Sequence, residues 1–290
     1  MTCPRNLMGK RAKVPVDTIT KARTWLPEGT PAPGVRNCGR ARAGGRILLG
    51  FRMPRWKSCL EPEPAMRVLA SADVHGRWSV YLWLLTIARE HHVEAIVLAG
   101  DLLGGLDGFD TPEQAQRHEA GMLIELLEGA AVPVLYIMGN DDLIELASSS
   151  DRVQSLHGRQ VDCGRIKFVG YQYSLPFMGG PFEKPEADIQ IDLARLPVSF
   201  DTETVFVSHS PAFGILDPGF GDSQIGSRSL REFLEANPCR AHIHGHSHAG
   251  FGRKDNRFNV ASAGKTRAMI IDLETLEHQF LGLEQGRLEP

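Results

Sequence analysis

The 290-residue sequence predicts an α/β fold with mixed sheets, preceded by a separate basic segment. Three observations support this prediction. From Met66 onward, short apolar runs typical of buried strands alternate with helical stretches. Later in the chain, strand-like runs follow one another through short turns, which favours antiparallel as well as parallel pairing. Before Met66 the chain is rich in Lys, Arg, Pro and Gly and lacks this alternation.

The apolar pattern predicts eight strands and a weaker ninth. They are Arg67–Ser71, Ala95–Ala99, Val132–Met138, Arg165–Gly170, Thr204–Ser208, Arg240–His244, Arg257–Ala261, Arg267–Leu273 and, more weakly, Leu276–Leu281. The predicted helices are Trp78–His91, Pro112–Glu128, a short one after Asp141, and Ser227–Glu235. Pro112 suits the first turn of its helix, with Thr111 as the N-cap.

Charge divides the chain into a basic arm and an acidic body. Residues 1–60 carry 13 Lys and Arg against two acidic residues, whereas residues 61–290 carry 19 basic and 33 acidic residues. The Pro/Gly-rich arm, residues 1–65, lacks enough apolar side chains to offset its ordering entropy, so we expect it to be disordered. An alternative expectation is that translation starts at Met66 or Met53, which the intact mass of the native protein would test. The working domain is expected to be residues 66–290.

Composition excludes several classes of protein. No apolar run approaches the roughly 20 residues of a membrane-spanning helix, so no membrane partner is expected. The five cysteines have no paired spacing, and the arm lacks a signal peptide, which predicts reduced thiols and a cytoplasmic protein. The sequence does not predict an oligomeric state.

Metal-binding residue types follow five of the predicted strands. They are Asp73 and His75 after the first, Asp101 after the second, Asn140, Asp141 and Asp142 after the third, His209 after Thr204–Ser208, and His246 and His248 after Arg240–His244. Because the carboxyl ends of strands form the ligand crevice of open α/β sheets, we expect these side chains to converge. His242 and His244 are expected to be inward-facing strand residues, with an orienting role for His244 as an alternative.

The chemistry of this set indicates a pair of metal ions. Carboxylates, an amide oxygen and imidazoles, without thiolates, suit Zn, Mn or Fe rather than a structural zinc site. Seven ligands exceed what one ion takes from a protein but serve two ions if a carboxylate bridges them. Two ions about 3.5–4 Å apart form the usual clamp for in-line displacement at phosphorus.

The ordered motifs resemble those of the calcineurin-like metallophosphoesterases: Asp73-x-His75, Gly100-Asp101, Gly139-Asn140-Asp141-Asp142, His209 and Gly245-His246-x-His248. The resemblance implies a two-sheet β-sandwich flanked by helices. It also implies that Asp73, His75 and His248 bind one ion, that Asn140, His209 and His246 bind the other, and that Asp101 bridges them. A metal-bridging hydroxide would then attack phosphorus in line. The catalytic residues implied are Asp101, Asn140, Asp142 and His209.

One position departs from the family pattern. Many members have His after the Gly-Asn pair, where this chain has Asp141, and that His is usually described as protonating the leaving group or contacting the phosphate. A carboxylate there would repel an incoming phosphate, and protonation of the leaving group would need another acid or an easy leaving group. Members that lack this His often look like phosphodiesterases, so the resemblance implies a phosphodiesterase acting on a small soluble substrate. Asp142 would orient the pair.

Two other functions remain open at this point. A nuclease could grip nucleic acid with the basic arm, although the acidic body disfavours this partner. A non-catalytic, metal-bearing scaffold is the other alternative. The long segment Tyr171–Lys184 has two interpretations: an ordinary Pro/Gly surface excursion, or a wall on the substrate side that Tyr171, Tyr173 and Phe177 form.

Overall fold

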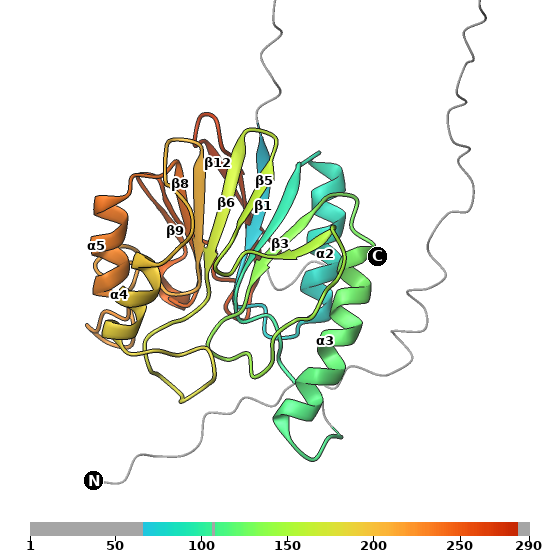
Figure 1. Ribbon diagram of the computed structural model, residues 1–290. Coiled ribbons are helices and arrows are strands. Elements are labelled where there is room, and N and C mark those ends of the chain that lie inside the picture. The colour runs from blue at the N-terminus through green and yellow to red at the C-terminus, as the bar shows by residue number, and fades with distance from the viewer. Residues whose placement is uncertain (1–65, 106–107, 284–290) are drawn as a thin grey trace, which may run out of the picture. The chain divides into compact units, whose positions relative to one another are not determined.

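The computed structural model describes residues 66–105 and 108–283, which form two six-stranded mixed sheets packed face to face (Figure 1). The first sheet has the order β12-β11-β1-β2-β3-β4. Its strands are β1 (Arg67–Ser71), β2 (Ala95–Ala99), β3 (Val134–Ile137), β4 (Val153–Ser155), β11 (Thr266–Asp272) and β12 (His278–Leu283). Strands β1 to β4 pair in parallel, whereas β11 and β12 are antiparallel to their neighbours.

The second sheet has the order β5-β6-β7-β8-β10-β9. Its strands are β5 (Gln160–Cys163), β6 (Ile166–Tyr171), β7 (Thr204–Ser208), β8 (Ala241–His244), β9 (Gly252–Lys254) and β10 (Arg257–Asn259). Strands β6, β7, β8 and β10 are parallel, and the edge strands β5 and β9 are antiparallel to them. The mixed sheets and the two-sheet sandwich that the sequence led us to expect are therefore confirmed.

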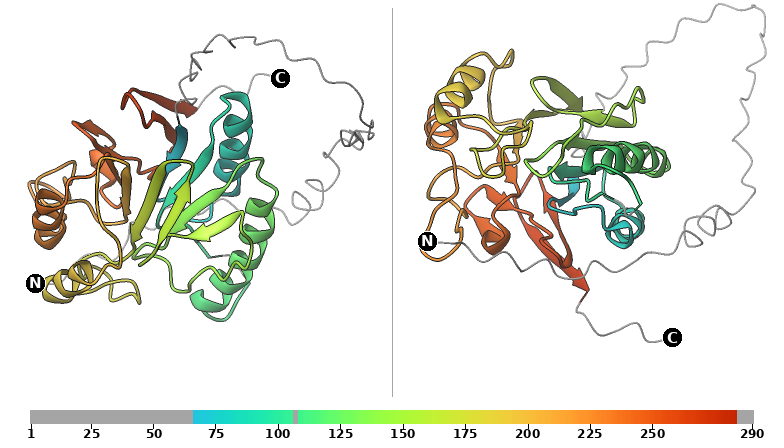
Figure 2. Two further views of the ribbon diagram at one scale, coloured as in Figure 1. Left: turned by 45° about the horizontal axis from the view of Figure 1, so that its top comes forward. Right: turned by 90° about the horizontal axis from the view of Figure 1, so that it is seen from below.

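Helices cover the outer face of each sheet. Helices α2 (Trp78–Glu90) and α3 (Pro112–Glu128) pack on the first sheet, and α4 (Glu186–Ala194) and α5 (Arg228–Ala236) pack on the second (Figures 1 and 2). Thr111 caps α3 as predicted, because its Oγ1 accepts a hydrogen bond from the Gln114 N–H at 3.2 Å.

Side-chain alternation along the strands builds three apolar layers. In β7, Val205 and Val207 point between the two sheets, whereas Phe206 points toward α4 and α5. In β1, Val68 likewise faces the other sheet and Leu69 faces α2. Successive strand residues point to opposite faces, and each sheet packs on the other sheet with one face and on helices with the other. Both faces are therefore buried, and the central strands are continuous apolar runs in the sequence.

Several local predictions differ from the structure. No helix follows Asp141, because the Asp142 carboxylate points back to the loop after β2 instead of capping a new helix. Helix α4 was not predicted, because Ile189 and Leu193 are its only buried residues and make a weak helical pattern. Strands β4, β5 and β9 are three or four residues long, too short to show a period. The predicted arm, residues 1–65, lies outside the described residues.

The carboxyl ends of β1, β2, β3, β7 and β8 meet at the lower end of the molecule in Figure 1, the end viewed on the right of Figure 2. The two sheets are joined there, since the Ala72 N–H donates to the Val260 carbonyl at 3.0 Å and the Ala72 carbonyl accepts from the Ser262 N–H at 2.7 Å.

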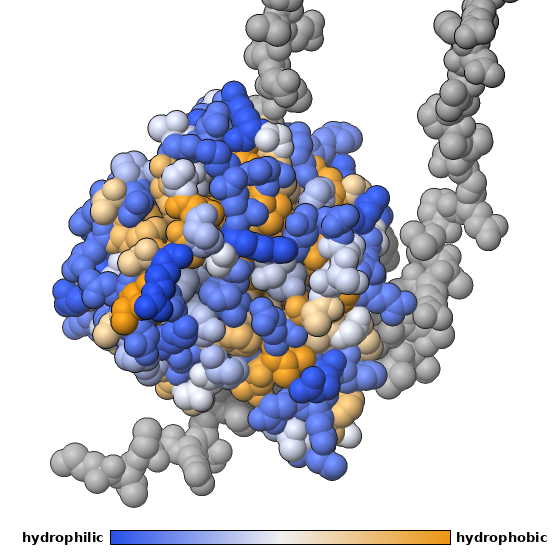
Figure 3. Space-filling model, in the orientation of Figure 1, coloured by the Kyte–Doolittle hydropathy of each residue, from blue (hydrophilic) through white to orange (hydrophobic). Residues whose placement is uncertain are grey.

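Among the described residues, no helix is long and apolar enough to cross a membrane. Hydrophilic residues cover most of the face in Figure 3.

Candidate metal centre

Four of the expected site residues have unusual backbone conformations. Asp73, His75, Asp101 and His246 all have positive φ, between 48° and 63°. Non-glycine residues rarely adopt this conformation, which costs free energy and is found where the surrounding structure holds a functional side chain in place. In each case the residue follows the end of a strand, so the turn aims the side chain across the end of the sheet.

Asp73 joins the ends of the two sheets. Its carboxylate is fully buried and accepts a hydrogen bond from the His246 N–H, at 3.0 Å to Oδ2. The Nε2 atom of His248 lies 3.1 Å from Asp73 Oδ1, although the two residues are 175 positions apart in the sequence. Both His residues follow β8 of the second sheet, whereas Asp73 follows β1 of the first.

Asp101 lies between the remaining residues. Its Oδ1 is 3.4 Å from His209 Nε2, and its Oδ2 is 3.9 Å from His75 Nε2. His209 Nε2 is also 3.0 Å from Asn140 Oδ1, and the His209 and His246 rings have centroids 5.0 Å apart. Together with the contacts of Asp73, these distances link all seven expected metal-binding residues into one continuous group.

Two glycines allow the backbone to come this close. A Cβ atom at Gly139 would overlap Asp101 Oδ1 and would lie 2.7 Å from His209 Cε1. Gly100, with φ of +93°, lies against the His209 ring, where a Cβ would be 2.8 Å from Cγ. The glycines beside Asp101 and Asn140 are therefore required by the dense packing of the site.

Buried carboxylates support the loop that carries Asp101. Asp142 accepts hydrogen bonds from the N–H groups of Leu102, Leu103 and Gly139, at 2.9, 2.8 and 2.8 Å. It thus orients the site by holding the backbone. Burial and the charge of Asp101 raise the pKa of Asp142 to about 7, against the effect of these three donors.

Glu119 is a second supporting carboxylate, which belongs to none of the sequence motifs. It is buried on α3 and accepts from the N–H groups of Gly104 and Gly105, at 3.0 and 2.7 Å. The signal was its position four residues after Ala115 and four before Leu123, on the buried face of the helix. An acidic residue on such a face must find hydrogen-bond donors.

His75 and Asp141 form an ion pair at the exposed side of the site. Asp141 Oδ2 lies 3.1 Å from His75 Nδ1, and the Asp141 N–H donates to Asp101 Oδ1 at 2.8 Å. Burial lowers the pKa of His75, but the hydrogen bond to Asp141 and the charges of Asp101 and Asp73 outweigh it and raise the pKa to about 9. Asp141 therefore holds the imidazole with its Nε2 atom turned toward Asp101.

The other two central histidines differ in charge. For His209, burial lowers the pKa, but the charge and hydrogen bond of Asp101 raise it to about 10. For His246, burial and the positive charge of His209 lower the pKa to about 4. Burial likewise makes the carboxyl of Asp101 harder to ionise, but His209 and His75 outweigh this, and the pKa of Asp101 is lowered. A group of carboxylates held together by protonated imidazoles is one in which a divalent cation can replace the protons.

His242 and His244 are inward-facing strand residues, as expected. Both are fully buried, and His242 Nε2 lies 2.7 Å from Ser208 Oγ. His244 Nδ1 lies 3.2 Å from the Gly245 carbonyl oxygen, and burial lowers the pKa of His244 to about 4. Neither residue belongs to the donor clusters described next.

The donor atoms fit divalent metal ions. Two clusters, Asp73–His75–His248 and Asp73–Asp101–His209, each have ligand atoms within 4.8 Å of one another. Their oxygen and imidazole nitrogen donors suit Zn, Mn or Fe, and neither described cysteine takes part. Asn140 and His246 lie beside the second cluster through their contacts with His209. The assignment of each ligand to one ion or the other stays a prediction.

A family model for calcineurin-like phosphoesterases matches residues 66–250. The chain belongs to this family. This calcineurin-like phosphoesterase is therefore a metal-dependent phosphoester hydrolase, and its family is dinuclear-metal dependent. No curated protein matches the sequence significantly.

Solved structures share the fold at low sequence identity. One crystal structure has a TM-score of 0.63 at 14% identity, covering 76% of this chain and 100% of its own. The protein TT1561 of Thermus thermophilus has a TM-score of 0.56 at 13% identity, covering 75% and 99%. A dimetal phosphatase from Danio rerio has a TM-score of 0.48 at 12% identity, covering 77% and 100%. The first two comparisons support the two-sheet fold of this phosphoesterase.

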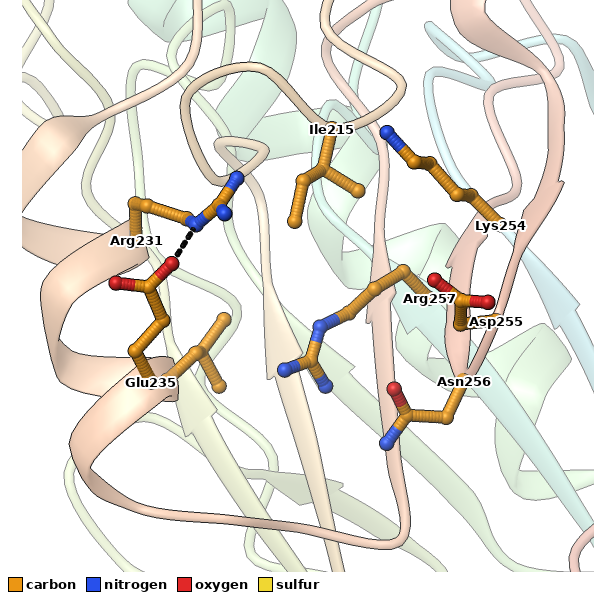
Figure 4. A pocket seen from close by; sticks show the side chains of 8 residues that line it. Ile215, Arg231, Glu235, Lys254, Asp255, Asn256 and Arg257 are labelled. Carbon is orange, nitrogen blue, oxygen red and sulfur yellow. Dashed lines mark hydrogen bonds and ion pairs between the residues drawn. The ribbon is translucent and has the colours of Figure 1, made fainter.

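A pocket of about 160 Å³ lies away from these residues, between α5 and the hairpin of β9 and β10 (Figure 4). Arg231 and Arg257 point into it, and Arg231 forms an ion pair with Glu235 of the same helix. Arg257 begins β10, so the pocket is at the opposite end of the second sheet from His246. None of the expected metal-binding residues lines it.

Proposed function

We propose that this phosphoesterase hydrolyses phosphodiesters of small soluble molecules, using two divalent ions of the Mn, Fe or Zn type. The observation that carries the preference for diesters is the Asp141 carboxylate. It is about half exposed at the mouth of the site, and its contacts with His75 and Asp101 hold it there. A phosphodiester brings one negative charge to this position, and a phosphomonoester brings close to two near neutral pH.

The extra charge of a monoester decides between the two substrates. Two unit charges about 6 Å apart repel by about 3 kcal/mol at an effective dielectric constant of 20. A carboxylate at Asp141 therefore penalises a dianion more than a monoanion. A His at this position would attract monoesters and diesters alike, so the presence of Asp141 in its place shifts specificity toward diesters.

The chain's own residues orient the reacting groups. Asp73, His75 and His248 would hold one ion, and Asn140, His209 and His246 the other, with Asp101 between them. When bound, such ions neutralise the phosphate charge and lower the pKa of a water molecule that can attack phosphorus. Asp142 keeps the Asp101 loop in place through three backbone hydrogen bonds.

The experiment compares Asp141→Asn with the unchanged protein on bis(4-nitrophenyl) phosphate and 4-nitrophenyl phosphate, after loading with Mn²⁺. The amide can still accept a hydrogen bond from His75 but carries no charge. We expect the ratio of monoester to diester kcat/KM to rise about ten- to a hundredfold. Asp151→Asn, an exposed carboxylate before β4 at the other end of the sheet, serves as the control and should leave the ratio unchanged. An unchanged ratio in Asp141→Asn would contradict the proposal.

The two alternatives have separate tests. A nuclease that uses the basic arm should lose DNA affinity, but not turnover of a small diester, when residues 1–60 are removed. A non-catalytic scaffold, which membership of a phosphoesterase family disfavours, should bind two ions and hydrolyse neither substrate. We favour the small-molecule esterase because the body carries 33 acidic against 19 basic residues, which repels extended nucleic acid.

A further inference from the structure

We infer that Phe177 binds a planar aromatic or heterocyclic group of the substrate, on the side of the phosphate nearest His246. The inference rests on the proposed function and deepens it by naming a substrate class: phosphodiesters in which at least one esterified group carries an aromatic ring. It starts from the segment between β6 and α4, for which a wall on the substrate side is one of the two interpretations of the sequence.

Phe177 lies beside the candidate metal centre. Its ring meets the His246 imidazole edge to face, with centroids 6.2 Å apart and planes at 87°. Three residues later, the backbone packs against another site residue, because a Cβ at Gly180 would lie 2.6 Å from the Asn140 carbonyl oxygen. The segment therefore contacts Asn140, which follows a strand of the first sheet, and His246, which follows a strand of the second. It borders the place where a phosphate would bind.

The other two aromatic residues of the expected wall have structural roles. Tyr171 is buried, and its hydroxyl donates to Asp192 Oδ2 at 3.0 Å. Tyr173 packs against Tyr171 and Phe182, and Lys184 covers its ring at 3.8 Å from the centroid. Only Phe177 of the three is presented at the site.

The tip that carries Phe177 is held in a defined shape. The Glu183 carboxylate accepts hydrogen bonds from the N–H groups of Phe177, Met178 and Gly179, at 2.8, 2.7 and 2.8 Å. The base of the loop is closed by Ser174, whose N–H donates to the Phe182 carbonyl and whose carbonyl accepts from the Lys184 N–H. A loop that is held by hydrogen bonds at its tip and at its base loses little conformational entropy when a ligand binds to it.

The apolar tip is exposed to water despite this order. The exposed fractions are 57% for Phe177 and 71% for Met178. Exposed apolar side chains on an ordered loop beside a metal centre are typical of a ligand-binding surface. Phe offers no hydrogen bond, so it selects by shape and by ring stacking, and a planar aromatic group gains most from such a contact.

Direct binding of two phosphonates tests the inference. Phenylphosphonate and methylphosphonate share the phosphonate group and differ in whether it carries a ring or a methyl group. We expect titration calorimetry on the Mn²⁺-loaded protein to show phenylphosphonate binding about five- to tenfold more tightly. Phe177→Ala should remove this preference while leaving methylphosphonate affinity unchanged, and Phe177→Trp should restore it. Retention of the preference in Phe177→Ala would overturn the inference.

A matched control and an independent measurement separate this result from other causes. Phe280→Ala removes a ring of similar exposure, 52%, on the edge strand β12, and should keep the preference. In turnover, Phe177→Ala should raise KM for bis(4-nitrophenyl) phosphate several-fold with little change in kcat. If the unchanged protein hydrolyses no diester, the proposed function fails. If it does, and Phe177→Ala retains both KM and phenylphosphonate affinity, only the role of Phe177 fails.

Discussion

The imidazole of His209 donates a hydrogen bond from Nδ1 to the carbonyl oxygen of Ala99, at 2.9 Å. A carbonyl oxygen can only accept, so this contact requires the proton on Nδ1. The other nitrogen, Nε2, is directed at Asp101 and Asn140, at 3.4 and 3.0 Å from their oxygen atoms. The end of β2 thus orients a histidine that follows β7 in the other sheet, in the manner typical of metal-binding imidazoles.

Replacement of His209 should therefore remove one metal ion. For His209→Ala we expect metal analysis to give one tightly bound ion per chain in place of two, and kcat on a phosphodiester to fall by at least about a thousandfold. His118→Ala changes an exposed histidine on α3 and should keep both ions and full turnover. Two ions and normal turnover in His209→Ala would exclude His209 as a ligand.

Metal binding should release protons. Asp141 and the site carboxylates raise the pKa of His75 to about 9 in the metal-free protein, and Asp101 raises that of His209 to about 10. Both imidazoles are protonated at about pH 7.5, so we expect about two protons released per chain on Mn²⁺ binding. Calorimetry in two buffers of different ionisation enthalpy measures this number, and His209→Ala should release one fewer. Binding without proton release would contradict the charge states of His75 and His209.

The same groups set the pH dependence of the metal-free fold. Both pKa values lie above the ordinary 6.5 of histidine. Between pH 6.5 and these raised values, the folded protein therefore binds more protons than the unfolded chain. Their stabilisation is complete below pH 6.5 and is lost as the pH rises through 9 and 10. Urea unfolding of the metal-free protein should show a free energy that declines from about pH 7 to about pH 10. A stability that rises over this range would refute the prediction.

A methyl group at Gly139 should disrupt the site. Its Cβ would overlap Asp101 Oδ1 and press on the His209 ring, so Gly139→Ala is expected to lower Mn²⁺ affinity at least tenfold. Gly121→Ala is the matched control, because a Cβ there meets nothing within 4 Å on α3. That control should raise the free energy of unfolding by up to about 1 kcal/mol and leave metal affinity unchanged.

Loss of the Asp142 carboxylate should destabilise the fold as well as the site. Asp142→Ala leaves three buried N–H groups without an acceptor, and we expect the free energy of unfolding to fall by about 3–6 kcal/mol. Asp142→Asn keeps one oxygen for Leu102 and Leu103, so its loss should be smaller. Urea denaturation of the metal-free proteins compares the two. Equal stability of the alanine variant and the unchanged protein would contradict this role.

The strands that carry the site could be predicted because they are buried on both faces. Ala95–Ala99 and Thr204–Ser208 have the predicted bounds, since each is a continuous apolar run that no surface helix would show. The two errors in the predicted helices also have physical causes. Helix α4 buries only two residues. The expected helix after Asp141 does not form, because the Asp142 carboxylate accepts hydrogen bonds from the loop after β2, a contact that the local sequence does not contain.

The contacts of Asp141 and Glu119 that support the site could not be predicted from the local sequence. The sequence shows that Asp141 stands where many relatives have His, but only the folded chain places its carboxylate 3.1 Å from His75. Glu119 offers a similar case, because its partners Gly104 and Gly105 lie 15 and 14 residues earlier in the chain. Neither contact follows from spacing.

Residue types and their order along the chain specify carboxylate, amide and imidazole ligands, and hence a metal-dependent phosphoesterase. Which of these atoms face one another depends on how the chain folds. Asp73 and His248 meet across 175 residues because β1 and β8 belong to different sheets whose carboxyl ends converge. That convergence depends on packing between the sheets, and an apolar core sets distances that no local pattern encodes.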